Sequence, residues 1–120
     1  MIWLIGFGGC LGAALRFLLG NYINREKNIF YPFPFATWLI NISGSLLLGL
    51  ILKLHLSNQL ADWVWYLLGI GFCGAYTTFS TFGFETLSLV QAKKRFLAAI
   101  YVFTSITVGT LAAFIGFILL

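Results

Sequence analysis

A polar stretch inside an otherwise apolar region is the part of the sequence most able to do chemistry. The segment GFCGAYTTFSTFGFE, Gly71 to Glu85, combines glycines with hydroxyl side chains and ends on a carboxylate. Glycine and threonine are poor residues for a continuous helix, so we expect an interruption here. In a membrane, interrupted backbone groups must be satisfied by protein, ion or water. Freed carbonyls attract cations and freed amides attract anions, so the stretch predicts an ion at the centre of a bundle.

Two aromatic residues in this stretch have two possible roles. Phe79 and Phe82 are three positions apart and share a helix face. Packing is the usual role of such a pair. An aromatic ring also has a positive edge, and rings presented edge-on could stabilise an anion without a full charge. Conduction requires weak binding at several sites, which favours ring edges over a full cation.

Two other apolar segments carry polar side chains at four-residue spacing. Thr37, Asn41 and Ser45 fall on one helix face, and Tyr101 and Ser105 repeat the spacing later in the chain. Such residues can link helices for about 1 kcal/mol each, and hydroxyls can bond back to their own helix. The alternative is a wet pathway, which two stripes in one small bundle favour.

Arg16 and Glu85 are ionisable residues within apolar segments, and such residues are functional candidates by default. Arg16 lies near the end of its segment, so it could instead extend to the membrane interface. Glu85 could equally line a vestibule. The sequence shows no metal cluster, nucleophile–base pair or phosphate-binding loop, so we do not expect an enzyme.

Composition indicates a membrane protein. Of the 120 residues, 61% are hydrophobic and 8% charged, and the mean hydropathy is +1.00, whereas about a quarter of a soluble domain is charged. A crossing helix needs about 20 residues, so the length allows at most four crossings in a single all-α domain, 1–120. We expect spans at 2–22, 35–54, 63–90 and 96–120, with the third broken or kinked because it is too long for one ordinary crossing.

Charge predicts the orientation. The net charge of +4 would suggest nucleic acid binding in a soluble protein, but here we attribute it to topology and expect no nucleic acid partner. Lys53 and both termini fall on one side of the expected bundle. Five basic residues fall on the other: Arg25, Lys27, Lys93, Lys94 and Arg95. The positive-inside rule makes this second side cytoplasmic.

Three segments carry a resemblance to a known family. GGCLGAALRF (from Gly8), ATWLINISGSLLLG (from Ala36) and GFCGAYTTFSTFGFE are similar to the Fluc family of fluoride channels, also called CrcB, and the resemblance covers nearly the whole chain. It implies a four-helix protein of the bacterial cytoplasmic membrane that forms an antiparallel dimer with two fluoride pores. Its activity would be passive fluoride export, which lowers fluoride toxicity inside the cell.

The resemblance also implies roles for particular residues. The carbonyls of Gly74 and Thr77 would hold a structural Na⁺ shared between subunits and not transported. Phe79 and Phe82 would form an aromatic box along the fluoride path. Arg16 matches an arginine of the first helix and Glu85 a vestibule carboxylate. The polar positions of the path fall on Thr37, Asn41, Ser80, Thr81, Tyr101 and Ser105.

Some alternatives remain open at this point. Family members that form homodimers insert in both orientations and carry weak charge bias, whereas this chain carries a strong one, so its partner could be itself or an oppositely oriented homologue. A proton-coupled fluoride exchanger would need titratable groups along the path, and Glu85 is the candidate. A non-conducting membrane scaffold subunit is the other alternative.

Overall fold

The computed structural model describes residues 2–25 and 34–119, and over these ranges it is helical, with no strand. Four helical stretches are long and apolar enough to cross a membrane: Ile2–Ile23, Phe35–Leu56, Asp62–Gln91 and Arg95–Leu119. The longest dimension, 48 Å, exceeds the roughly 30 Å of a bilayer's hydrocarbon core. The chain is therefore a multi-pass, all-α membrane protein, as expected. Lys27 and the side chain of Arg25 lie outside the described residues.

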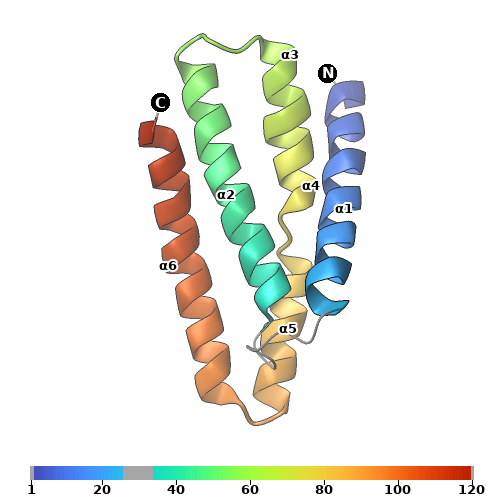
Figure 1. Cartoon of the computed structure of the whole chain (residues 1–120), viewed down its shortest axis with the longest axis vertical. Helices are drawn as coiled ribbons and strands as arrows, with labels where there is room; N and C mark the ends of the chain where they lie inside the picture. Colours follow the sequence, from blue (N-terminus) through green and yellow to red (C-terminus); the bar gives the residue numbers. More distant parts are fainter. Residues whose placement is uncertain (1, 26–33, 120) are drawn as a thin grey trace.

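Three of the crossings are single helices and the third is composite. The single helices are α1 (Ile2–Arg25), α2 (Phe35–Leu56) and α6 (Arg95–Leu119). The composite crossing consists of α3 (Asp62–Val64), the π-helical segment η1 (Trp65–Cys73), α4 (Gly74–Tyr76) and α5 (Ser80–Gln91). Both described chain ends lie at the same end of the bundle, and the α5–α6 turn lies at the other (Figure 1).

The third crossing is interrupted between α4 and α5, and Figure 1 shows the resulting bend. Gly71 and Gly74, which suggested the interruption, both stay helical. Helix α4 instead ends at Tyr76, and the backbone of the next residue, Thr77, is extended with ψ 154°. The expectation of a broken third helix is confirmed, and the break lies just after the glycines.

Close packing of α1 against the third crossing explains why α1 has glycine at positions 8 and 12. A Cβ placed on Gly8 would collide with the Leu67 carbonyl, and one on Gly12 would collide with the Phe72 carbonyl. Small residues allow helices in membranes to approach closely. These glycines therefore fix α1 against η1 and the start of α4.

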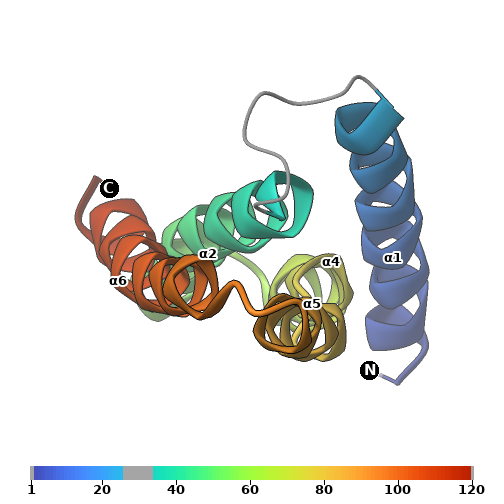
Figure 2. The same ribbon diagram turned by 90° about the horizontal axis from the view of Figure 1, so that it is seen from below.

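A second glycine contact joins α2 to α6. A Cβ on Gly49 would collide with the Ala113 carbonyl, and one on Gly116 with the Leu46 carbonyl. Figure 2 shows the resulting order, with α4 and α5 lying between α1 and the α2–α6 pair. The interruption thus faces helices on both sides.

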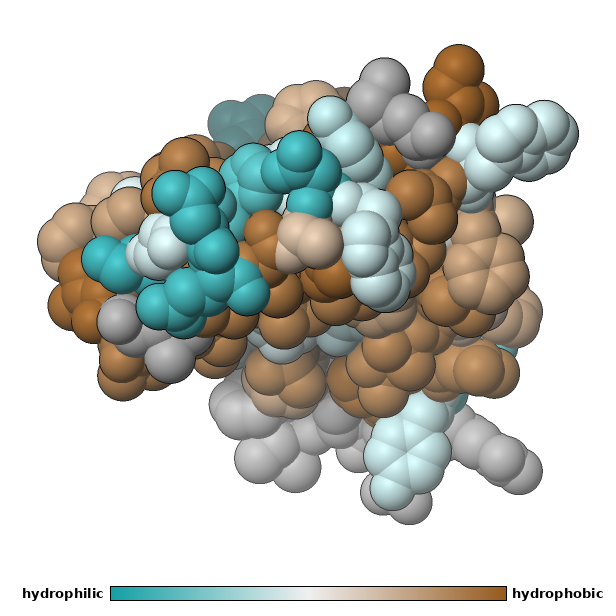
Figure 3. Space-filling model, turned by 90° about the horizontal axis from the view of Figure 1, so that it is seen from above, coloured by the Kyte–Doolittle hydropathy of each residue, from teal (hydrophilic) through white to brown (hydrophobic). Residues whose placement is uncertain are grey.

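The surface has the distribution of a bilayer protein. Seen from the end that carries the α2–α3 turn, hydrophilic side chains gather at that end, whereas the sides are largely apolar (Figure 3). Ser57, Asn58 and Gln59 are exposed in this turn, and Asn58 adopts the left-handed conformation with φ 59°. Polar residues therefore mark a membrane interface.

Candidate functional site

The interruption redirects two backbone hydrogen bonds. In a continuous α-helix the Thr78 N–H would donate to the Gly74 carbonyl, and the Thr81 N–H to the Thr77 carbonyl. Here the Thr78 N–H donates to Asn41 Oδ1 at 2.8 Å, and the Thr81 N–H donates to Thr78 Oγ1 at 3.3 Å. The carbonyls of Gly74 and Thr77 therefore lack their helical donors.

Asn41 links α2 to the interruption. Its Nδ2 donates to the Thr78 carbonyl at 3.0 Å, so the amide engages both backbone groups of one residue. Ser45, one turn along the same stripe, donates to the Asn41 carbonyl at 2.9 Å and so bonds within its own helix. In this structure Asn41 makes an interhelical contact, one of the roles left open by the sequence.

Arg16 points into the bundle. Its Nε donates to the Ala75 carbonyl at 3.0 Å, one residue before α4 ends at Tyr76. A cation is stabilised near a helix C-terminus by the helix dipole and the unpaired carbonyls. The structure therefore shows an inward contact for this guanidinium in place of an extension toward the interface.

Two residues that the sequence analysis did not single out also hold α4. The hydroxyls of Ser43 and Tyr76 lie 2.9 Å apart, and Tyr76 is buried at the last position of α4. The signal for this pair was weak, because Ser43 lies off the four-residue stripe of Thr37 and Asn41. Its partner is 33 residues away in the sequence.

A polar cavity of 230 Å³ lies on the side of the interruption that faces the α5–α6 turn. It brings together residues from α1, α2, α5 and the interruption itself. Its charged and hydroxyl-bearing lining residues are Arg16, Thr37, Thr78, Thr81 and Glu85. Four of the residues expected to act in function thus share one cavity.

Glu85 joins three helices at the edge of this cavity. The Tyr101 hydroxyl of α6 donates to Glu85 Oε1 at 3.5 Å, and Thr37 of α2 lines the same cavity as Glu85. Tyr101 is fully buried and Thr37 is buried. The two polar stripes of α2 and α6 therefore meet near this carboxyl group.

A row of aromatic rings begins beside the cavity. The ring centroids of Tyr101 and Phe82 are 5.0 Å apart, and those of Phe82 and Phe79 are 6.3 Å apart, with both pairs tilted. Phe79 is 85% exposed, so the row runs from the buried interior to the surface of the chain. Tilted rings present edges, which carry partial positive charge.

Ser105 and Ser80 lie beyond the cavity lining. Ser105 Oγ is buried and has no hydrogen-bond partner among the described residues. A buried hydroxyl without a partner lowers the stability of the fold. Ser80 is exposed at the start of α5, directly after Phe79.

Comparison with known proteins identifies the family of this chain. A family model described as "CrcB-like protein, Camphor Resistance (CrcB)" matches residues 3–117. The chain belongs to the CrcB family. The expected family resemblance is thereby confirmed.

Relatives of this CrcB chain match it almost end to end. The "Fluoride-specific ion channel FluC 2" of Rhodococcus jostii is 40% identical over 116 residues, which cover 97% of this chain and 95% of the relative. The FluC channel of Oceanobacillus iheyensis is also 40% identical over 116 residues, with 96% and 87% coverage. That of Flavobacterium psychrophilum is 38% identical over 119 residues, with 98% and 94% coverage.

Proposed function

We propose that this chain forms a fluoride-selective channel that passively exports fluoride across the bacterial cytoplasmic membrane and so lowers its toxicity. Relatives that match nearly the whole chain are named fluoride-specific ion channels. The observation that carries the proposal is one continuous series of polar and aromatic groups. It runs from the 230 Å³ cavity past Tyr101 and the two phenylalanine rings, with the unpartnered Ser105 hydroxyl on the same helix as Tyr101.

The chemistry of this series suits a small anion. Hydroxyls of Thr37, Thr81 and Ser105 and the second N–H of the Asn41 amide are donors that could replace water molecules around fluoride. Ring edges of Phe79 and Phe82 add weak positive potential. Each contact is weak, and conduction needs binding that is both favourable and easily released. A larger halide would gain less from donors spaced for a small ion.

A structural Na⁺ fits the two carbonyls at the interruption. The carbonyls of Gly74 and Thr77 have lost their helical donors, and carbonyls at the ends of half-helices coordinate Na⁺ in membrane proteins. The Thr77 hydroxyl donates to the Cys73 carbonyl at 2.9 Å, so the main chain of Thr77 would be the ligand. Bound Na⁺ would supply positive charge that neutralises these dipoles without itself being transported.

An antiparallel second copy, or an oppositely oriented homologue, would complete this arrangement. Two carbonyls are too few to surround a cation, and a related subunit would supply a second pair. Gly74 and Phe79 are also exposed on the single chain. Interrupted backbone is not tolerated against lipid, so another protein surface must cover it. Inverted pairs of subunits or repeats commonly surround ion sites at mid-membrane.

The direct experiment uses purified protein in liposomes loaded with potassium fluoride, with valinomycin to carry the counter-ion and a fluoride electrode outside. We expect rapid fluoride release, and no comparable chloride release, followed with a chloride electrode, from liposomes loaded with potassium chloride. Equal release of both halides would contradict selectivity. Absence of fluoride release from the chain alone would contradict self-sufficient conduction and favour either a paired homologue or a scaffold role.

Glu85 supports a second candidate, a proton-coupled fluoride exchanger, because a carboxyl group lines the cavity. A channel only dissipates the electrochemical gradient of fluoride, whereas an exchanger can use an opposed proton gradient to accumulate it. Fluoride uptake by initially fluoride-poor liposomes against its own gradient, driven by a pH difference, would favour the exchanger. We expect no such uptake.

A further inference from the structure

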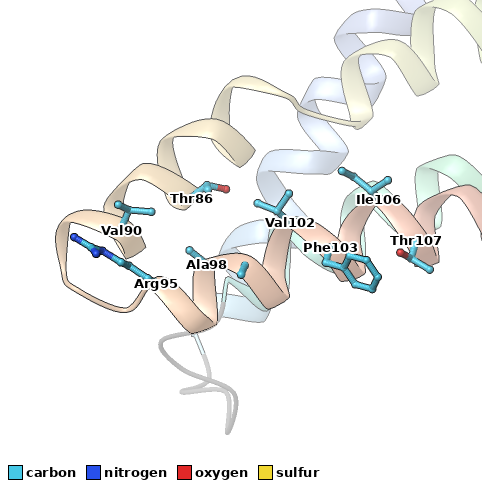
Figure 4. A pocket seen from close by; sticks show the side chains of 9 residues that line it. Thr86, Val90, Arg95, Ala98, Val102, Phe103, Ile106 and Thr107 are labelled. Carbon is cyan, nitrogen blue, oxygen red and sulfur yellow. The ribbon is translucent and has the colours of Figure 1, made fainter.

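A second cavity lies away from the proposed ion pathway. It is a groove of 640 Å³ on the outside of the bundle, between α5 and α6. Figure 4 shows residues of both helices lining it, with Arg95 at the turn. The lining consists of Thr86, Val90, Arg95, Ala98, Ala99, Val102, Phe103, Ile106 and Thr107. None of these residues belongs to the proposed fluoride path.

The groove has the polarity and the length of a lipid chain site. Most of its lining is apolar, and the Thr86 hydroxyl is already used by a bond to the Phe82 carbonyl at 2.8 Å. On α6 the lining runs from Arg95 to Thr107, which is roughly 18 Å of helix rise. One leaflet contributes about half of the roughly 30 Å hydrocarbon core. An acyl chain of a single leaflet therefore matches the groove.

The end of the groove is strongly basic. Lys93, Lys94 and Arg95, here called the basic turn, are consecutive and exposed. The turn is held by main-chain bonds, since the Lys94 N–H donates to the Leu89 carbonyl at 2.9 Å and the Lys93 N–H to the Val90 carbonyl at 3.0 Å. Arg95 thus lines the groove itself, and Lys93 and Lys94 precede it in the turn at the membrane-interface end.

We propose that this groove binds an anionic phospholipid, with an acyl chain between α5 and α6 and the phosphate on the basic turn. Basic pockets between membrane helices on the cytoplasmic side bind anionic lipid head groups, and the expected orientation places the basic turn on that side. A second copy of the chain is a poorer occupant, because the sequence has seven basic and only three acidic residues. A phospholipid brings the missing negative charge.

The test measures motionally restricted spin-labelled lipid by electron paramagnetic resonance, with the protein in phosphatidylcholine vesicles. Traces of spin-labelled phosphatidylglycerol or spin-labelled phosphatidylcholine serve as probes. The wild-type protein should restrict phosphatidylglycerol more strongly than phosphatidylcholine. Arg95→Gln should lower that preference about fivefold, the change expected for one basic residue at a membrane surface.

Two further variants separate this groove from general attraction to the protein. Lys53→Gln removes one positive charge at the opposite end of the bundle, where Lys53 lies 4.9 Å from the ring centre of Phe117, and should keep the preference. Ala99→Phe fills the groove from an exposed position and should remove the restricted phosphatidylglycerol component while leaving the protein folded.

Three results would overturn the proposal. The first is equal restriction of both lipids by the wild-type protein. The second is loss of the preference in Lys53→Gln equal to the loss in Arg95→Gln. The third is efficient cross-linking of two copies through Ala99→Cys in a Cys10→Ser background, which would show that a second copy covers the groove. Cys73 is buried, so it does not compete in that reaction.

Discussion

The side-chain amide of Asn41 pairs with the backbone of Thr78 in both directions, accepting its N–H at 2.8 Å and donating to its carbonyl at 3.0 Å. Asn41 thereby behaves like a peptide group of a neighbouring strand. Helix α2 supplies the hydrogen bonds that the third crossing loses at its interruption. The same contact takes the Thr78 N–H away from the Gly74 carbonyl and so leaves that oxygen for another ligand.

Replacing Asn41 with alanine should therefore lower both stability and fluoride release. Asn41→Ala leaves the N–H and carbonyl of Thr78 unpaired inside the membrane, at a cost of about 1–3 kcal/mol for each group. Thermal unfolding in detergent and fluoride release from liposomes measure the two effects. Ser45→Ala is the matched control, because Ser45 bonds only within its own helix. Wild-type stability of Asn41→Ala would contradict this role.

Arg16→Gln should destabilise the protein by about 1.5–3 kcal/mol, the range for hydrogen bonds that involve a charged group. The variant loses the bond from Nε to the Ala75 carbonyl. Arg16→Lys should recover only part of the loss, because an ammonium keeps the charge near the α4 C-terminus without the guanidinium geometry. Chemical denaturation in detergent measures the free energy of unfolding of both variants. If Arg16→Gln and Arg16→Lys are both as stable as the wild type, the bond to Ala75 does not hold the fold, and Arg16 lies at the membrane interface.

Phe79→Ile and Phe82→Ile should each reduce fluoride release severalfold with little effect on folding. Isoleucine retains apolar bulk but has no ring edge of positive potential. Phe84→Ile serves as the control, since Phe84 is 71% exposed and lies on the same helix, outside the row of rings. Initial release rates from liposomes with equal protein content measure the effect. Unchanged rates in both test variants would remove the rings from the path.

Gly12→Ala should destabilise the fold, whereas Gly6→Ala should not. A Cβ on Gly12 meets the backbone carbonyl of Phe72, which cannot move without shifting the third crossing, and a Cβ on Gly6 meets nothing within 4 Å. Gly6→Ala should even gain a little stability, because the helix propensity of alanine is about 1 kcal/mol more favourable than that of glycine. Unfolding temperatures of the two variants test the difference, and equal values would argue against close packing of α1.

Gly74→Leu should separate the proposed dimer while leaving the single chain folded. A Cβ at Gly74 meets nothing within 4 Å on its own chain, so an effect of this substitution must come from a covering partner. Gly6→Leu is the control on an equally open site. Light scattering of the purified protein in detergent gives the oligomeric mass. A dimer of normal stability in Gly74→Leu would mean that the partner does not cover the interruption.

The sequence predicted the class of fold and the existence of the interruption, because hydropathy and helix propensity are local properties. The interruption lies within the stretch Gly71–Glu85, as expected, but after its first two glycines. Gly71 stays helical, and its missing side chain lets α1 approach, since a Cβ there would lie 2.6 Å from the Ile5 carbonyl oxygen. The chain breaks at Thr77–Phe79 instead, where Asn41 can bond to the freed backbone. That partner is 37 residues distant.

The contacts of the charged and hydroxyl side chains were less accessible to sequence reasoning. Arg16 had two open roles, and its acceptor, the Ala75 carbonyl, is 59 residues away. The pair of Ser43 and Tyr76 had no periodic signal at all. By contrast, the positions of Thr37, which shares a cavity with Glu85, and of Tyr101, which bonds to Glu85, follow the two polar stripes that spacing had indicated.

The account is tested most directly by the reversal potential of currents through the purified protein in a planar bilayer, with fluoride unequal on the two sides and chloride equal. We predict reversal at the equilibrium potential of fluoride, unmoved when a pH difference is added. Reversal at the chloride potential, or a shift that follows the proton gradient, would contradict a passive fluoride-selective path.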